Sequence, residues 1–262
     1  MNNPFLPDKM KILEIVPETE IDYTFVLACE KPVKPGQFFQ LSIPGAGEAP
    51  ISVSDFDDGR LLLTIRKVGR LTNAIFALGP GDFLFVRGPY GNGFDDRDYV
   101  GSDLKVIAGG TGLAPVKKVI KNFIGSDKVA SLEVLLGFKT PEDILYRDVV
   151  RSWVDSGVAT LTVDKAGPEW SGNTGLITGY LKGLDLGNLE NCKFIVVGPP
   201  VMIKFITLEL LLLQVPEDNI WVSLERKMSC GIGKCGHCKI DETYVCLEGP
   251  VFRFARARRL LD

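Results

Sequence analysis

Histidine is almost absent from this sequence: His237 is the single one among 262 residues. A Ser–His–Asp or Cys–His catalytic arrangement needs an imidazole as its general base. Because His237 lies inside a cysteine-rich loop, we expect no such arrangement elsewhere in the chain. An enzyme built on this sequence is therefore expected to depend on bound cofactors rather than on acid–base side chains.

An excess of one charge and a long apolar run are also missing. Lys plus Arg number 30 against 33 Asp plus Glu, so a net charge of -3 gives no reason to expect nucleic acid or an anionic membrane as a partner. The longest apolar run, 208–215, contains Glu209 and Gln214 and is too short to cross a bilayer. The start, MNNPFLPDKMKILEIV, has no basic segment followed by an apolar one, so we expect no secretory signal and a cytoplasmic location.

Cysteine, in contrast, is concentrated in one stretch. Residues 229–246 read SCGIGKCGHCKIDETYVC and contain Cys230, Cys235, Cys238 and Cys246. Their spacing, C-x4-C-x2-C-x7-C, opens like the plant-type [2Fe-2S] pattern. A loop around an inorganic core needs positive backbone torsions and amides directed at the sulfurs, and its glycines at 231, 233 and 236 suit both needs. The stretch predicts a [2Fe-2S] site.

Three other interpretations of these cysteines stay open. Structural zinc could use the four thiolates, or three of them with His237, although zinc ligands more often come as two separate knuckles. Disulfides suit short secreted domains better than this chain. A reduced cysteine cluster in a core would have no reason to adopt this spacing.

The first hundred residues indicate β structure. Runs rich in β-branched or aromatic residues, at 22–29, 37–43, 60–67 and 83–87, alternate with turn signals such as Pro35-Gly36 and Gly79-Pro80-Gly81. Strands at this spacing predict a sandwich or a small barrel. One helix, 73–78 with Thr72 as its cap, is expected to interrupt them.

After residue 101 the pattern changes to strands that alternate with helices. Apolar strands are expected at 104–108, 131–137, 159–163, 193–197 and 220–224, and helices at 114–124 and 200–213. Such alternation is typical of a parallel α/β sheet. The chain is therefore expected to form a β domain (1–100), an α/β domain (101–224) and a cluster module (225–262).

Two turns at strand ends have the composition of a dinucleotide site. Gly109-Gly110-Thr111-Gly112 follows a strand and opens a helix, where backbone amides can approach a pyrophosphate, although Pro115 stands at the usual third glycine. Gly198-Pro199-Pro200 would lie at the same edge of a parallel sheet. A tight turn without a ligand is the simpler alternative for either one alone.

Two stretches of the β domain are candidates for a second cofactor. Residues 49–54, APISVS, combine a rigid extended entry with two hydroxyls, and 66–72, RKVGRLT, leads from a strand through a basic turn to a helix start. Taken alone, both are interpreted as ordinary turns of a β domain. The stretch 88–93, GPYGNG, is either a turn that joins two domains or a wall beside a cofactor.

Together these stretches resemble the ferredoxin-reductase superfamily. More narrowly, the chain resembles electron-transfer subunits that end in a [2Fe-2S] loop: those of dihydroorotate dehydrogenase, the gamma subunit of sulfhydrogenase and, in nearest likeness, the corresponding electron-transfer subunit of anaerobic sulfite reductase. The likeness covers nearly the whole chain and lies in GEAPISVSD (47–55), YGNG (90–93), GGTGLAPV (109–116), VGPP (197–200), GKCGHC (233–238) and 244–252.

The resemblance implies an antiparallel β-barrel that binds FAD, a parallel α/β domain that binds NAD and a small C-terminal [2Fe-2S] module. Electrons would pass from NADH, preferred over NADPH on resemblance alone, to FAD, to the cluster and on to a partner subunit. The expected partners are the other subunits of a reductase, one ferredoxin-like and one catalytic with a sirohaem-type site. The equivalent subunit of a hydrogenase or of dihydroorotate dehydrogenase is the alternative, and a zinc-stapled binding module is a rival of another class.

Carried over residue by residue, the resemblance gives each motif a role. The flavin ring and ribityl chain would be bordered by Pro50, Ile51, Ser52 and Val53. The FAD pyrophosphate would be held by Gly69 and Thr72, the nicotinamide nucleotide by Gly110, Thr111, Gly112, Gly198 and Pro199, and the iron by Cys230, Cys235, Cys238 and Cys246. The superfamily usually has an arginine where this chain has Ala49, which removes a strong phosphate contact; Arg66 or Arg87 would have to replace it.

Overall fold

The computed structural model describes residues 3–260 and divides them into two compact units. The barrel unit comprises the residues up to Phe94 together with Leu224–Val251. The α/β unit comprises Asp95–Ser223 and the residues from Phe252 onward. The segment with the cysteine loop thus belongs to the same unit as the N-terminal strands, and the expected division into three domains at 100 and 224 stays a prediction.

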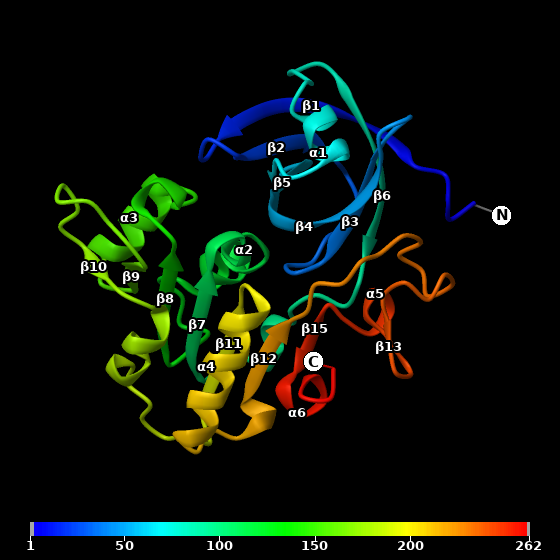
Figure 1. The fold of residues 1–262 in the computed structure, drawn as a ribbon. Helices are drawn as coiled ribbons and strands as arrows, with labels where there is room; N and C mark the ends of the chain where they lie inside the picture. Colours follow the sequence, from blue (N-terminus) through cyan, green and yellow to red (C-terminus); the bar gives the residue numbers. More distant parts are fainter. Residues whose placement is uncertain (1–2, 261–262) are drawn as a thin grey trace. The chain divides into compact units, whose positions relative to one another are not determined.

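The barrel unit is built on six antiparallel strands that close in the order β1-β2-β5-β4-β3-β6 (Figure 1). Their bounds are β1 Asp8–Pro17, β2 Asp22–Ala28, β3 Phe38–Ile43, β4 Gly47–Asp57, β5 Arg60–Arg66 and β6 Phe83–Tyr90. Alternating apolar side chains fill the interior: Phe25, Phe39, Leu41, Leu61 and Leu63 are completely buried. The sequence predicts β2, β3, β5 and β6 correctly, and a barrel as one of two architectures, but not β1 or the full length of β4.

A short helix and the cysteine segment complete this unit. The helix is α1 (Arg70–Ile75), between β5 and β6. The cysteine segment has the two-stranded sheet β13 (Lys239–Ile240) and β14 (Thr243–Tyr244), followed by α5 (Val245–Glu248).

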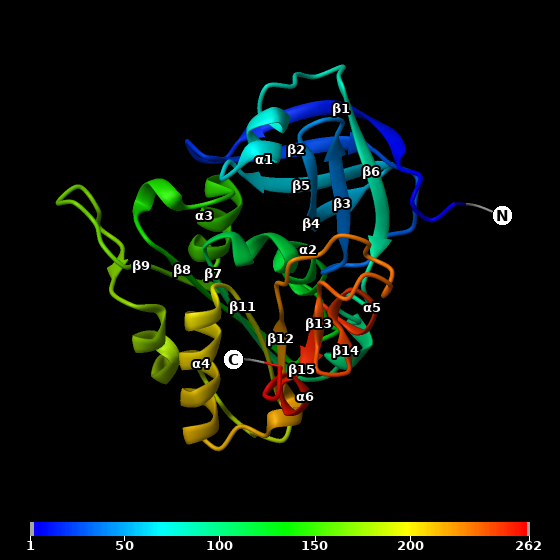
Figure 2. The same cartoon turned by 45° about the vertical axis from the view of Figure 1, so that its right-hand side comes forward.

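The α/β unit has a seven-stranded sheet in the order β10-β9-β8-β7-β11-β12-β15 (Figure 2). Along the chain, helices alternate with its parallel strands. The strands are β7 Asp103–Gly109, β8 Ser131–Phe138, β9 Ala159–Val163, β10 Asn173–Thr174, β11 Cys192–Val197, β12 Ile220–Ser223 and β15 Val251–Arg253. The helices are α2 Leu113–Phe123, α3 Arg147–Asp155, α4 Pro200–Leu212 and α6 Phe254–Ala257, with short 3-10 turns at Asp96–Asp98, Gly110–Gly112, Pro141–Asp143, Ile177–Gly183 and Glu217–Asn219.

The predicted parallel α/β sheet is confirmed, and its strand order locates a binding edge. The chain runs outward from β7 through β8 and β9 on one side, and through β11 and β12 on the other. The winding therefore reverses between β7 and β11, and in such sheets ligands bind at the carboxyl ends of the strands beside this switch point. Within residues 3–260, no helix has both the length and the apolar character that a membrane crossing requires.

Candidate functional site: two cofactor turns and a four-cysteine loop

The two glycine turns of the α/β unit lie at the switch point of its sheet. β7 and β11 are parallel neighbours, with Val197 opposite Ala108, so the turns that follow them meet at one edge. The packing there leaves no room for a side chain at Gly112, because a Cβ would lie 2.6 Å from the carbonyl oxygen of Val197 and 2.7 Å from the Cα of Gly198. The structure therefore brings the two predicted turns together.

Each predicted nucleotide residue has a definite place at this edge. Gly110 has a φ of +54°, which a residue with a side chain resists, and it opens the 3-10 turn that leads into α2. Thr111 is half-buried in that turn, and Pro199 is the N-cap of α4. Two helices thus begin here, and helix N-termini favour phosphate groups through their amides and dipoles. The residues present fit a dinucleotide.

The predicted flavin strand is the first half of β4, and its residues alternate between two faces. Val53 is 1% exposed in the barrel core, and Ile51 is partly buried against the same cluster. Pro50 and Ser52 lie on the other face of the strand. In the register with β3 they stand opposite Gln40 and Phe38. Only alternate residues of this stretch can therefore present their side chains to one ligand surface.

The turn before α1 is organised by Thr72, but not as the predicted helix cap. The helix begins three residues earlier than expected, with Gly69 as its N-cap, and Thr72 lies inside its first turn. The Thr72 hydroxyl accepts the amides of Val68 (2.9 Å) and Gly69 (3.0 Å). The prediction of Thr72 as cap is wrong because hydroxyl residues also suit the third helical position, from which they bond back to the cap backbone.

Arg66, a candidate for the missing phosphate contact, has a buried partner. Its Nε and one terminal nitrogen donate to the two carboxylate oxygens of Asp22, both at 2.8 Å. The Asp22 side chain is completely buried, and Thr19 also donates to it at 2.9 Å. This bidentate ion pair fixes the orientation of the guanidinium. The edge of Arg66 that carries Nε is therefore used to bind Asp22 within the barrel.

The four predicted iron ligands lie in one loop, and backbone amides donate to the sulfurs of two of them. Cys230 Sγ accepts amides from Ile232 (3.5 Å), Lys234 (3.3 Å) and Cys235 (3.4 Å), and Cys246 Sγ accepts the amide of Gly233 (3.2 Å). The loop glycines at 231, 233 and 236 have φ values of +72°, +70° and +78°, as the sequence predicts for a loop that turns its amides inward.

The thiols of the loop are in unequal environments. Amide hydrogen bonds from His237 and Cys230 lower the pKa of Cys235 to about 7, whereas burial and the neighbouring Cys238 thiol raise the pKa of Cys246 to about 12. Among the described residues, no three His, Cys, Asp or Glu side chains are gathered for a single metal ion. Four thiols within one loop, with amides directed at Cys230 and Cys246, are the donor set that a two-iron cluster takes.

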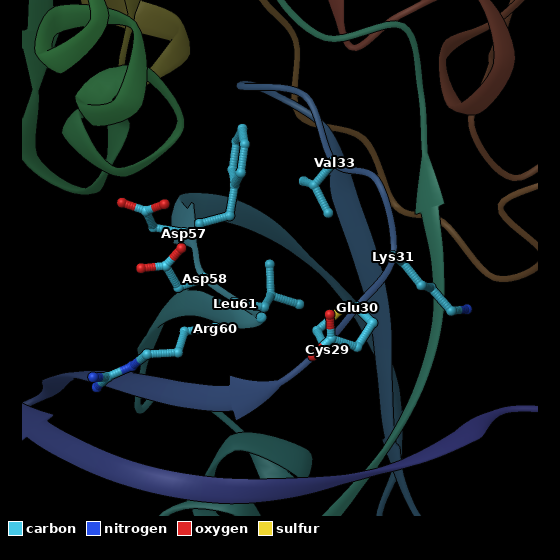
Figure 3. A pocket seen from close by; sticks show the side chains of 10 residues that line it. Cys29, Glu30, Lys31, Val33, Asp57, Asp58, Arg60 and Leu61 are labelled. Atoms are coloured by element: carbon cyan, nitrogen blue, oxygen red, sulfur yellow. The ribbon is translucent and has the colours of Figure 1, made fainter.

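The other two cysteines lie away from this loop in the chain. All six are free thiols. Cys192 is the first residue of β11 and is completely buried. Cys29 follows β2 and lines a pocket of about 120 Å³ with Glu30, Lys31 and the β4–β5 turn (Figure 3).

Sequence reasoning missed the residues that fasten the cysteine segment to the barrel. Arg87, within β6, donates to the carbonyl oxygens of Ser229 and Cys230, both at 2.9 Å. Asn92 donates to the carbonyl oxygens of Glu248 (3.0 Å) and Val251 (2.7 Å) and accepts the Val251 amide (3.2 Å). The 88–93 stretch therefore contains an anchor for the cysteine segment. In the sequence, the local sign of the Arg87 contact is that this arginine follows the apolar run 83–86.

Comparisons with known proteins agree with this architecture. A family model described as the oxidoreductase NAD-binding domain matches residues 106–207. A second, described as the iron-sulfur cluster binding domain of dihydroorotate dehydrogenase B, matches residues 225–257. The matched ranges contain, respectively, the two glycine turns and the four cysteines.

Whole-chain relatives extend the agreement. The chain is 35% identical to the sulfhydrogenase 1 subunit gamma of Pyrococcus furiosus, over 97% of this chain and 92% of that protein. It is 36% identical to the probable dihydroorotate dehydrogenase B (NAD(+)) electron transfer subunit of the same organism, over 83% of this chain and 78% of that protein.

Solved structures share the fold. The NADH-dependent reduced ferredoxin-NADP oxidoreductase superposes with a TM-score of 0.76 at 25% identity, covering 97% of this chain and 90% of that one. The cytochrome b5 reductase domain of Ulva prolifera nitrate reductase, at 20% identity and a TM-score of 0.70, covers 84% of this chain and 97% of its own and shares the fold alone. The chain belongs to the ferredoxin-reductase-like family of electron-transfer subunits, and it is an NAD(P)H oxidoreductase subunit with sites for NAD, FAD and an iron–sulfur cluster.

Proposed function

We propose that this chain oxidises NAD(P)H and delivers single electrons through a [2Fe-2S] cluster to a partner subunit. One observation carries the proposal: a four-cysteine loop, lined with amides, is hydrogen-bonded directly to strand β6 of a flavin-type barrel by Arg87. When bound, FAD takes two electrons with a hydride and the cluster accepts electrons one at a time. We therefore place both the FAD and the cluster on the barrel unit.

The residues of the chain then bind and orient rather than react. Hydride transfer requires two rings held at van der Waals distance, and no side chain has to act as an acid or base. We assign these roles as the resemblance implies: Pro50, Ile51, Ser52 and Val53 border the flavin; Gly69 and Thr72 receive its pyrophosphate; Gly110, Thr111, Gly112, Gly198 and Pro199 receive the nicotinamide nucleotide; Cys230, Cys235, Cys238 and Cys246 bind iron. We add Arg66 as the candidate that replaces the phosphate contact missing at Ala49.

For the terminal reaction we propose sulfite reduction in a cytoplasmic multi-subunit enzyme. The support is the likeness of 47–55, 90–93, 233–238 and 244–252 to the electron-transfer subunit of anaerobic sulfite reductase. Once the four loop cysteines are used, Cys29 and Cys192 alone remain, too few to ligate another iron–sulfur centre. The six-electron reduction of sulfite would therefore take place on a sirohaem-type partner, with a ferredoxin-like subunit expected between the two.

A second candidate keeps the same electron path and changes the partner. The 35% identity with a sulfhydrogenase gamma subunit and the match to the cluster-binding domain of dihydroorotate dehydrogenase B favour a hydrogenase or a dihydroorotate dehydrogenase. The residues of the two cofactor turns and of the cysteine loop would act in the same way in each case.

Anaerobic purification of the tagged chain with its natural partners separates these candidates. The purified complex is given NADH and, in turn, sulfite, protons or polysulfide, and orotate, and its subunits are identified by mass spectrometry. NADH-dependent sulfite consumption supports the proposal, whereas turnover of one of the other acceptors supports the second candidate. Cys235→Ser should abolish turnover and Cys29→Ser should not; equal activity in both variants would contradict the electron path.

A further inference from the structure

Arg87 is a buried cation that is hydrogen-bonded to the backbone of Cys230, the first cysteine of the loop. Its side chain is 6% exposed. One terminal nitrogen donates to the Cys230 carbonyl oxygen (2.9 Å) and to the Tyr90 hydroxyl (3.2 Å). The other donates to the Ser229 carbonyl oxygen (2.9 Å) and to the Glu48 carboxylate. A single guanidinium thus connects β6 with the start of the cysteine loop.

The counter-charge of Arg87, the Glu48 carboxylate, is more exposed to solvent than Arg87 is. Glu48 belongs to β4, and β3 separates β4 from β6 in the barrel. Its side chain is 31% exposed, so solvent screens it more than it screens Arg87. On the loop side, Arg87 contacts two neutral carbonyl groups. The pair thus presents its guanidinium, and not its carboxylate, to the backbone at Ser229 and Cys230.

This arrangement makes Arg87 unsuited to contact the FAD pyrophosphate in place of the arginine missing at position 49. Four hydrogen bonds already engage both terminal nitrogens, and none of these partners is on the 66–72 turn. A phosphate contact would require a rearrangement of the loop start. The strong, directional bonds of this guanidinium serve the cysteine loop instead.

We propose that Arg87 is a positioning residue that fixes the loop at Cys230 and, through its buried charge, favours the reduced state of the cluster. The inference rests on the proposed function of the loop as a [2Fe-2S] site. A cluster gains one negative charge on reduction, and charge and hydrogen bonding near the ligands set its potential. A cation in a poorly solvated position stabilises that added charge far more than an exposed cation does.

Lys234 is the matched exposed cation. It lies within the cysteine loop itself, four residues after Cys230, and its side chain is exposed, with its ammonium 5.7 Å from the Phe5 ring centre. Loss of its charge should change the potential less than loss of the Arg87 charge, although Lys234 is nearer in sequence. If proximity in sequence set the effect on the potential, Lys234 would have the larger effect. If burial sets it, Arg87 has the larger effect.

The experiment is a redox titration of the anaerobically reconstituted chain, followed by the EPR signal of the reduced cluster, with iron content measured in parallel. At the midpoint potential of the unaltered protein, Arg87→Met should lower the ratio of reduced to oxidised cluster about tenfold, equal to 59 mV for a one-electron couple. Glu48→Gln should raise the ratio, because the counter-charge is removed. Arg87→Lys, which keeps the charge, should stay within about twofold, and Lys234→Gln should do the same.

The variants also separate failure of this inference from failure of the proposed function. If the unaltered chain binds no cluster, the proposed function and the inference both fall. If it binds one, equal ratios in Arg87→Met and Lys234→Gln, or a lowered ratio in Glu48→Gln, would overturn the role of Arg87 alone. Should Arg87→Met lose its iron, Glu48→Gln and Arg87→Lys decide: a raised ratio in the first with an unchanged ratio in the second supports the inference, and any other combination refutes it.

Discussion

The nucleotide turn depends on the close approach of two strand ends, and Gly112→Ala tests that dependence. The added Cβ would lie 2.6 Å from the Val197 carbonyl oxygen and 2.7 Å from the Gly198 Cα. Both are backbone atoms held by the adjacent strand β11, so neither can move aside as a flexible side chain does. We expect the two turns to be pushed apart at a cost of about 2 kcal/mol, which is within the usual range for overpacking.

The same displacement moves the amides that we propose to receive the dinucleotide. If the full cost appears in binding, the affinity for NAD⁺ falls about 30-fold, since 1.4 kcal/mol corresponds to a factor of ten. Isothermal titration of the FAD-loaded variant with NAD⁺ measures this loss, and thermal unfolding measures the part of the cost that appears as stability.

Gly101→Ala is the matched control at the other end of β7. Gly101 has a φ of +75°, and within residues 3–260 no heavy atom lies within 4 Å of an added Cβ. This variant should lose about 1 kcal/mol of stability through backbone strain and keep its affinity for NAD⁺. Unchanged affinity and stability in Gly112→Ala, or an equal loss of affinity in both variants, would refute the reasoning.

Three further experiments test buried groups within each unit. The Tyr99 hydroxyl is buried and, in the described part of the chain, has no hydrogen-bond partner, so Tyr99→Phe should raise the free energy of unfolding in urea by about 1 kcal/mol. Because burial raises the pKa of Tyr99 well above its usual value, the folded state loses stability as the pH rises above about 10, and the variant should lose less; an equal loss would contradict this. Burial raises the pKa of Cys192 to about 11, so iodoacetamide at about pH 8 should label Cys29 but not Cys192 in the folded, cluster-loaded chain, as mass spectrometry can verify. Arg66→Ala leaves the buried Asp22 carboxylate without its guanidinium and should cost about 3 kcal/mol in urea, and the double change Arg66→Met with Asp22→Asn should recover most of it; no recovery would argue against the ion pair as the cause.

The sequence predicts the features that depend on local pattern. Alternating apolar residues and turn signals predict β2, β3, β5 and β6, and the spacing and glycines of the four-cysteine stretch predict a loop with amides directed at sulfur. The strand–turn–helix at 109–112 and the turn at 198–200 could be assigned to one sheet edge because carboxyl ends of parallel strands meet there. In each case the signal lies within about eighteen neighbouring residues.

Long-range contacts could not be predicted in this way. The hydrogen bond between Arg87 and the Cys230 carbonyl joins positions 143 residues apart, and nothing near Arg87 in the sequence points to that partner. For the same reason Arg66 could be proposed as a phosphate ligand without its buried partner Asp22, which comes from the neighbouring strand β2. The start of α1 was misplaced because Gly69 offers no side-chain signal and Thr72 does.

The most direct test of the electron path is an anaerobic titration of the isolated chain, reconstituted with FAD, iron and sulfide, against NADH. The account predicts about two irons per chain, loss of the oxidised flavin absorbance and the appearance of the EPR signal of a reduced [2Fe-2S] cluster on addition of NADH. Cys235→Ser should still lose its flavin absorbance but give no such signal. A chain that binds stoichiometric zinc instead of iron, or whose cluster stays oxidised while its flavin is reduced, would contradict the account.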